Sequence, residues 1–435
     1  MKRELGRGQG RNILREKLAA GGTAAVSGFG AAAVQSGGEA SAASEAGAAA
    51  DPRGRSTAAA VQSSAGTAEA NVSRPAGDKR RLGGLYKRLP ALAASLALLG
   101  GLLAGCGAQG PSAEAGDGGA PQGDVTLVIG AYSVVKDSVQ DIIPLFQQKW
   151  KAETGQTVTF EESYEASGTQ ARAIVGGFEA DVTLLSLEGD IDKLTKAGLV
   201  NENWKDKPAK GMITRSVAVI GTREGNPLGI RSFADLAKPG VKVLYPNPKT
   251  SGGAQWDINA IYGAGLKESE RETGRKDPAF AKAFLQSVHA NIESLDKSGR
   301  ASMAAFEYGV GDALVTYENE LVARIKQGAT YEVVVPDDTI LIENPAAVVD
   351  ENVDKHGTRD AAEAFLDFLW SPQAQRVFAE NGFRPTESSV YAEFKADYPE
   401  PPGLFDIGYL GGWSEVREKL YSKRGVWYEV LAGVR

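Results

Sequence analysis

From residue 124 onward, short apolar runs alternate with segments in which apolar residues recur every three or four positions. Three of the runs predict β-strands, at 125–129, 157–160 and 181–185. Each run is followed by helical spacing, at 137–150, 168–175 and 190–197. Strands that alternate with helices are typical of an α/β architecture with largely parallel sheets.

Extended segments later in the chain suggest that one lobe is inserted into another. One lies at 216–220, and two more lie at 331–335 and 340–349. They bracket a middle block, and this organisation predicts two lobes, lobe one at 124–214 and 343–435 and lobe two at 215–342. Near the end of the chain, 358–380 has the pattern of one long amphipathic helix with a Ser-Pro turn at 371–372.

The N-terminal part of the chain has a different composition. Residues 1–78 are mostly Gly, Ala, Ser, Arg and Glu, and such a segment buries too little apolar surface to fold, so we expect it to be disordered. Residues 79–105 begin with basic side chains and continue into a short apolar run. That run has the length of a signal segment and is short for a membrane span.

The signal segment leads into Leu103-Ala104-Gly105-Cys106, which resembles a bacterial lipobox. In a lipobox the cysteine is lipidated and becomes the new N-terminus. Residues 106–123 are rich in Gly, Ala and Pro, and they predict a flexible tether. We therefore expect an extracytoplasmic protein whose membrane anchor is a lipid on Cys106.

The composition of the chain excludes several classes of function. The 435 residues carry a formal net charge of −7, which argues against a general nucleic-acid binder. One cysteine excludes an intramolecular disulfide and a multi-cysteine zinc site, and two histidines exclude an all-histidine metal site. We expect no metal and no cofactor. Because the chain is acidic, any binding of an anion must come from a local array of hydrogen-bond donors.

Such an array is predicted in the segment 240–256. An apolar strand at 240–244 leads to the sequence NPKTSGGAQW at 247–256, and a helical pattern follows Ser251. The first N–H groups of a helix have no intrahelical acceptor, and they bind anions. Gly252 and Gly253 lack a Cβ, so a ligand can approach these groups closely. The alternative is a capped helix without a ligand.

The segment 247–256 closely resembles the signature NPK(T/S)SGGARW of bacterial periplasmic sulfate-binding proteins, the receptors of sulfate and thiosulfate ABC importers. Further stretches resemble motifs of the same family, at 180–192, 223–227, 311–320, 383–385 and 411–413. The resemblance covers about 124–430. It implies a periplasmic-binding-protein-like type II fold, in which two α/β lobes with mixed sheets surround a ligand cleft.

The resemblance also implies the ligand-binding residues. In the family, uncharged donors from both lobes hold sulfate. The matching positions are Ser251, Gly252 and Gly253 in the signature, Ser167 as a hydroxyl donor from the other lobe, Ser133 and Gly299 as backbone donors, and Tyr317 in place of a tryptophan that donates its indole N–H. Ser298 is an alternative to Gly299. Gln255 replaces the arginine of the signature.

The resulting hypothesis is a monomeric receptor that binds sulfate or thiosulfate and delivers it to a membrane permease without catalysis. Neutral donors favour sulfate over phosphate, because a P–OH group would face a donor and find no acceptor. One alternative is a receptor for another oxyanion, such as molybdate. A second is an extracytoplasmic ester hydrolase, which would need a nucleophile–base pair or a metal cluster. A third is a sensor that docks on a signalling protein.

Overall fold

The computed structural model describes residues 123–433. The predicted extension, the signal segment and Cys106 lie outside the described residues, as does most of the predicted tether. The strands are β1 (Val125–Tyr132), β2 (Val158–Glu165), β3 (Val182–Leu184), β4 (Met212–Thr222), β5 (Val243–Pro246), β6 (Ile292–Asp296), β7 (Ala313–Tyr317), β8 (Glu332–Val334), β9 (Leu341–Val348) and β10 (Arg384–Pro385).

The α-helices are α2 (Lys136–Thr154), α3 (Ser167–Val175), α4 (Glu188–Lys196), α5 (Gly252–Thr273), α6 (Pro278–His289), α7 (Gly299–Glu307), α8 (Glu318–Lys326), α9 (Asp350–His356), α10 (Arg359–Phe368), α11 (Pro372–Glu380), α12 (Ser388–Phe394), α13 (Gly412–Val416) and α14 (Val426–Gly433). Short 3-10 turns are η1 (Ser133–Val135), η2 (Glu202–Asp206), η3 (Pro208–Gly211), η4 (Phe233–Ala237) and η5 (Ile407–Leu410), and η6 (Arg417–Tyr421) is a π-helical turn. Within residues 123–433, none of the helices combines the length and the apolar character that crossing a membrane requires.

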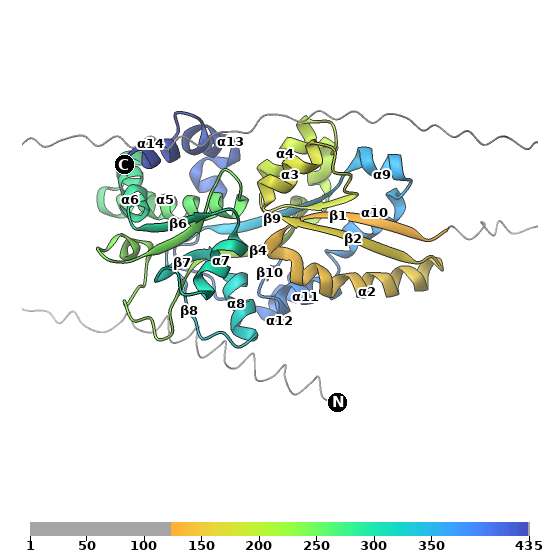
Figure 1. The fold of residues 1–435 in the computed structure, drawn as a ribbon, viewed down its shortest axis with the longest axis horizontal. Helices are drawn as coiled ribbons and strands as arrows, with labels where there is room; N and C mark the ends of the chain where they lie inside the picture. The colour runs from red at the N-terminus through yellow and green to blue at the C-terminus, as the bar shows by residue number, and fades with distance from the viewer. Residues whose placement is uncertain (1–122, 434–435) are drawn as a thin grey trace, which may run out of the picture. The chain divides into compact units, whose positions relative to one another are not determined.

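The strands form one mixed sheet in the order β2-β1-β3-β9-β4-β7-β5-β6. At one end, β1 is parallel to β2 and β3, and at the other, β5 is parallel to β6 and β7. We call these ends the β1 half and the β5 half. In Figure 1 the β1 half lies on the right and the β5 half on the left. Parallel pairing within each half agrees with the predicted alternation of strands and helices.

Two antiparallel strands, β4 and β9, join the halves. The first part of β4 pairs with β9, and from Ala218 onward β4 pairs with β7. Strand β9 pairs with β4 up to Pro345 and then with β3 from Ala346. Both strands correspond to extended segments that the sequence pattern predicts. Because each strand is shared, the two halves are parts of one continuous sheet.

Helices cover both faces of the β1 half. On one face, α2 and α10 enclose an aromatic cluster with β2, in which the rings of Phe146 and Phe365 lie 5.2 Å apart and those of Phe160 and Phe365 lie 5.0 Å apart. On the other face, α3 and α4 bury Ile174 and Leu194. Figure 1 shows α3 and α4 above the strands and α2 below them. Strand β1 is buried on both faces from Ile129 to Tyr132, whereas at its start Thr126 is exposed and Val128 is half-buried.

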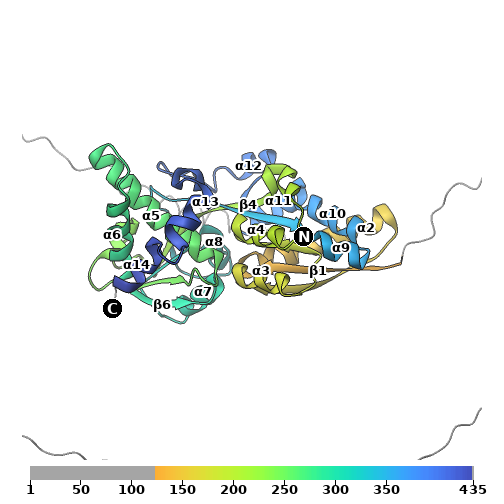
Figure 2. The ribbon, with the colours of Figure 1, turned by 90° about the horizontal axis from the view of Figure 1, so that it is seen from above.

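The C-terminal helices contact the β5 half. Trp413 of α13 lies edge-on against Trp256 of α5, and Trp427 of α14 contacts Tyr245 and His289. Figure 2 shows α14 beside α6. The predicted lobe one includes 343–435, but the segment from 407 onward lies against helices of the range predicted as lobe two. The lobe boundaries otherwise stay a prediction.

The predicted long helix at 358–380 is two helices, which meet at the predicted Ser-Pro turn. It breaks between α10 and α11, where Ser371 is extended and its side chain accepts a hydrogen bond from the N–H of Ala374. Pro372 disfavours helical geometry in the residue before it. As the first residue of α11, it has no N–H that would need an acceptor.

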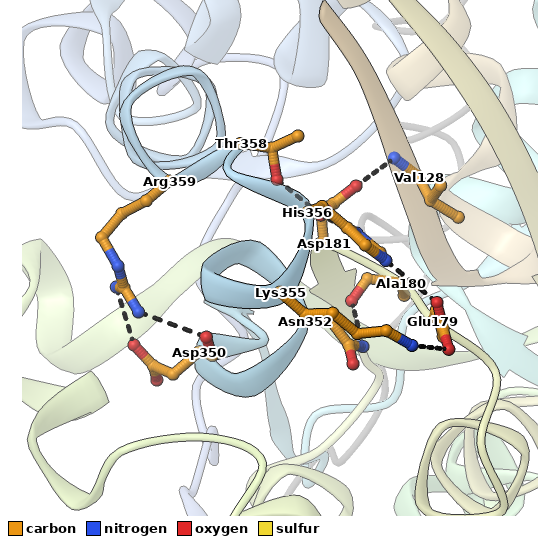
Figure 3. Close-up of polar contacts among 10 residues, drawn as sticks. All are labelled: Val128, Glu179, Ala180, Asp181, Asp350, Asn352, Lys355, His356, Thr358 and Arg359. Atoms are coloured by element: carbon orange, nitrogen blue, oxygen red, sulfur yellow. Dashed lines mark hydrogen bonds and ion pairs between the residues drawn. The ribbon is translucent and has the colours of Figure 1, made fainter.

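A buried carboxylate ties α9 and α10 to the β1 half (Figure 3). Asp181 accepts hydrogen bonds from the N–H of Val128 at 2.8 Å and from the hydroxyl of Thr358 at 2.7 Å. His356 contacts Asp181 through Nδ1 at 2.8 Å and Glu179 through Nε2 at 3.0 Å. The hydrogen bonds to Glu179 and Asp181 raise the pKa of His356 above its ordinary value.

This cluster predicts a pH-dependent stability. A raised folded-state pKa means that the contribution of His356 is fully present below the unfolded pKa of about 6.5 and is lost as pH rises through the folded pKa. His356→Gln removes the titration. In thermal denaturation we expect the melting temperature of the wild type to exceed that of the variant by the largest margin below about pH 6.5 and by a shrinking margin as the pH rises above this value. A margin that grows with pH would contradict the charged form of His356.

Candidate functional site

A small cavity of about 20 Å³ lies where the two halves meet. Residues from the ends of β1 and β7 and from the first turns of α3, α5 and α7 line it. Six of the seven predicted ligand-binding residues are in the lining, namely Ser133, Ser167, Ser251, Gly253, Gly299 and Tyr317. The tertiary structure therefore brings together positions that are up to 184 residues apart, from Ser133 to Tyr317.

Three helices begin at this cavity with a serine or a glycine, α3 at Ser167, α5 at Gly252 and α7 at Gly299, and a fourth, α8, begins there at Glu318. Ser251 caps α5 by accepting a hydrogen bond from the N–H of Ala254, and Ser298 caps α7 in the same way. The remaining N–H groups of each first turn have no intrahelical acceptor and carry the positive end of the helix dipole. No Lys or Arg among the described residues lines the cavity.

Gly252 does not line the cavity, although it was predicted to bind the ligand. It lies beside the cavity, where the loop after β3 approaches closely. A Cβ at Gly252 would lie 2.0 Å from Oγ of Ser186 and 3.0 Å from Cδ2 of Leu187, so no side chain fits. A Cβ at Gly253 would meet its nearest atom, Oγ of Ser251, at 3.3 Å. Glycine at 252 therefore permits the β1 half to approach the start of α5.

Ser186 joins the loop after β3 to α5 and β9, and it was not among the residues predicted from the sequence. Its carbonyl accepts from Nε1 of Trp256 at 2.7 Å and from Nδ2 of Asn344 at 2.9 Å. Its own hydroxyl lines the cavity, is buried, and has no hydrogen-bond partner among the described residues. The available signal was its position directly after the 180–185 segment that resembles a family motif.

The Ser167 hydroxyl already has a partner. It donates to Oδ2 of Asp190 at 2.5 Å, and its oxygen accepts from the N–H of Ser186 at 2.9 Å. Asp190 is buried and pairs with Lys193 at 2.5 Å. A buried carboxylate needs such donors, so the hydroxyl proton points to Asp190. What Ser167 offers to the cavity in this arrangement is its backbone N–H at the start of α3.

Tyr317 ends β7 and is 2% exposed. Its hydroxyl has no hydrogen-bond partner among the described residues, and the same holds for the hydroxyl of Tyr132 across the cavity lining. Burial raises the pKa of both phenols, so both stay protonated and can donate. A buried hydroxyl without a partner costs about 1–3 kcal/mol, which a ligand that accepts its proton would recover.

Two carboxyl groups also line the cavity, and the sequence analysis placed neither of them there. Asp257 lies one turn into α5, directly after the signature, and Glu320 lies in the first turn of α8. Both are at least 95% buried. Burial raises the pKa of each carboxyl above its ordinary value. The cavity is therefore not lined by hydroxyl and backbone donors alone.

Gln255 does not line the cavity. Its side-chain Nε2 donates to the backbone carbonyl of Pro248 at 3.3 Å, and its backbone carbonyl accepts from the hydroxyl of Tyr421 at 3.0 Å. The replacement of the signature arginine by Gln255 therefore acts on the loop before α5.

Residues 127–384 match the family model described as bacterial extracellular solute-binding protein. The chain belongs to the bacterial extracellular solute-binding proteins. It is 40% identical to the sulfate-binding protein of Synechococcus elongatus, over 75% of this chain and 91% of that protein. It is 35% identical to the sulfate-binding protein of Escherichia coli, covering 71% and 93%, and 35% identical to the thiosulfate-binding protein of Pseudomonas aeruginosa, covering 72% and 95%.

Among solved structures, the chain resembles the sulfate-binding protein SubI from Mycobacterium tuberculosis H37Rv, with 35% identity and a TM-score of 0.63. The match covers 68% of this chain and 100% of that one. A periplasmic thiamin binding protein has the same fold at 18% identity, with a TM-score of 0.52. The predicted periplasmic-binding-protein fold and the predicted family are confirmed.

The unpartnered hydroxyl of Tyr317 gives a prediction about stability. In the protein without ligand, Tyr317→Phe removes a buried group that has no partner, so we expect the free energy of unfolding to stay the same or rise. Tyr245→Phe is the matched control. The hydroxyl of Tyr245 contacts Nδ1 of His289 at 2.5 Å, and its loss should cost about 0.5–1.5 kcal/mol. Urea denaturation measures both, and a larger loss for Tyr317→Phe would contradict the contacts described.

Proposed function

We propose that this protein is the receptor of an ABC importer and that it binds sulfate, with thiosulfate as a second ligand, in the cavity between its halves. It would deliver the anion to a membrane permease and carry out no reaction. The family, the relatives named sulfate-binding and thiosulfate-binding proteins, and the chemistry of the cavity support this proposal.

The start of three helices at one cavity is the observation that carries the proposal. Free N–H groups and dipoles of α3, α5 and α7 offer several donors to an anion, and no lysine or arginine of the described lining neutralises it. The fully deprotonated dianion of a strong acid suits such a site because it can accept hydrogen bonds at all of its oxygens. Sulfate and thiosulfate meet this requirement across the ordinary pH range.

The proposed contacts follow from which groups remain available. The backbone N–H groups of Ser133, Ser167, Gly253 and Gly299, which line the cavity, would donate from the helix and turn starts. The hydroxyl of Ser251 accepts from Ala254 and keeps its own proton for the ligand. The hydroxyl of Tyr317 would gain the partner that it lacks.

Calorimetric titration of the purified full-length protein tests the function. We expect sulfate to bind most tightly, thiosulfate next, and phosphate more weakly, because the donors at the helix starts leave a P–OH group only the two buried carboxyl groups as acceptors. Molybdate is the further competitor. Tighter binding of molybdate or phosphate than of sulfate would replace the proposed ligand, and no heat with any of the four would refute an oxyanion receptor.

Tyr317→Phe tests the site within the same assay. A hydrogen bond to a charged group contributes about 1.5–3 kcal/mol, so we expect a loss of roughly ten- to a hundredfold in sulfate affinity. Tyr245→Phe, whose hydroxyl contacts His289 and is absent from the cavity lining, should bind sulfate like the wild type. Equal affinity of both variants would mean that Tyr317 only packs against its neighbours.

We further propose that a lipid on Cys106 anchors the protein on the outer face of the cytoplasmic membrane. The lipobox-like sequence before Cys106 and membership in an extracellular family support this. Cys106→Ala should leave the protein unprocessed or release it into the soluble fraction. Cell fractionation with a size comparison decides, and a variant of mature size that stays with the membrane would contradict the anchor.

A further inference from the structure

Asp257 is the most unusual group in the cavity of an anion receptor. Its side chain is 1% exposed, and its Oδ1 has no hydrogen-bond partner among the described residues. It lines the same cavity as the starts of α5 and α7. An ionised carboxylate at this position would repel the anion that the N–H groups at the helix starts attract.

The second carboxyl group of the cavity, Glu320, has partners that Asp257 lacks. Its Oε2 accepts from the hydroxyl of Thr316 at 2.7 Å, and its Oε1 lies 3.9 Å from Nε of Arg300. No ion pair between Asp257 and a basic side chain is formed within residues 123–433. Glu320 can therefore keep its charge more easily than Asp257 can.

The titratable groups that interact electrostatically with Asp257 come from four elements. They are the phenols of Tyr245 on β5, Tyr317 on β7 and Tyr421 on η6, and the carboxyl of Glu320 on α8. None of them supplies positive charge. Burial raises the pKa of Asp257 well above its usual range, and the negative charge of Glu320 raises it further.

A bound dianion adds to this effect. In a dry cavity a negative carboxylate next to a dianion is strongly repelled, whereas a neutral carboxyl group can donate its proton in a charge-assisted hydrogen bond. We propose that Asp257 is protonated when an oxyanion occupies the cavity and donates a hydrogen bond to it, so that ligand binding takes up one proton. This inference rests on the proposed binding of sulfate.

The proton balance is simple. Wherever Asp257 is ionised in the free protein, binding takes up one proton from solution together with one sulfate dianion, and the only covalent bond formed is the O–H bond of Asp257. Sulfate keeps its charge between about pH 6 and 8.5, so it does not supply the proton. His289, which contacts Tyr245, has a pKa lowered to about 4 by burial and stays neutral over that range.

The expected consequence is an affinity that decreases as pH rises. Where the free protein has lost the proton and the complex retains it, sulfate affinity falls by up to about tenfold per pH unit. Asp257→Asn places an amide donor at the same position and cannot ionise. Its affinity should be nearly constant with pH and should exceed that of the wild type at high pH.

Calorimetry of the full-length protein with sodium sulfate tests this at about pH 6, 7.2 and 8.5. Each titration is repeated in two buffers with different ionisation enthalpies, which counts the protons taken up. Glu320→Gln tests the other carboxyl group. Glu351→Gln, an exposed position on α9, controls for the loss of one negative charge elsewhere.

We expect proton uptake in the wild type, Glu320→Gln and Glu351→Gln, and none in Asp257→Asn. Proton uptake that disappears in Glu320→Gln and persists in Asp257→Asn would overturn the assignment to Asp257. Wild-type sulfate binding without proton uptake or pH dependence would overturn the inference and leave the proposed function intact. A wild type that binds no sulfate at any pH would refute the proposed function, and the inference with it. Should Asp257→Asn fail to fold, the wild type and Glu320→Gln titrations still decide.

Discussion

The unsatisfied N–H groups at the start of three helices are the constraint on which this structure depends. A helix leaves its first N–H groups without intrahelical partners, and burying them is costly unless another acceptor is supplied. Here α3, α5 and α7 all begin at one small cavity, with serine caps on two of them. A dianion in that cavity satisfies many donors at once, and the N–H groups need no lysine or arginine to hold it.

The close packing of the β1 half against the β5 half follows from the need to bring these helix starts together. Donors from the β1 half and the β5 half can reach one small ligand only if the loop after β3 lies close to the start of α5. Gly252 makes room for it, and the Ser186 carbonyl joins it to Trp256 and Asn344. Arg300 of α7 adds an ion pair with Asp137 of α2 at 3.3 Å. Because β4 and β9 run through both halves, movement between the halves would bend these two strands.

The charges of the cavity lining must also be compatible with a bound dianion. The lining combines neutral donors with two buried carboxyl groups, one near a guanidinium and one without any basic partner. A cavity that receives a dianion favours the protonated form of a carboxyl group that has no basic partner, because no cationic side chain among the described lining residues offsets its charge. The protein thereby gains a donor from a residue type that is ordinarily an acceptor. Proton uptake and anion uptake then become one event.

The sequence by itself determined the local features. The alternation of strands and helices, the capped start of α5 after Ser251 and the family motif at 247–256 are all carried by neighbouring residues, since caps, glycines and apolar periodicity act over a few positions. The family motifs also predicted six residues of the cavity lining, but only the tertiary structure showed which further side chains meet them there. Asp257 and Glu320 lie 63 positions apart, and the hydroxyl of Ser167 is engaged by Asp190. Burial and pairing across such distances depend on the packing of the whole fold, which no local pattern records.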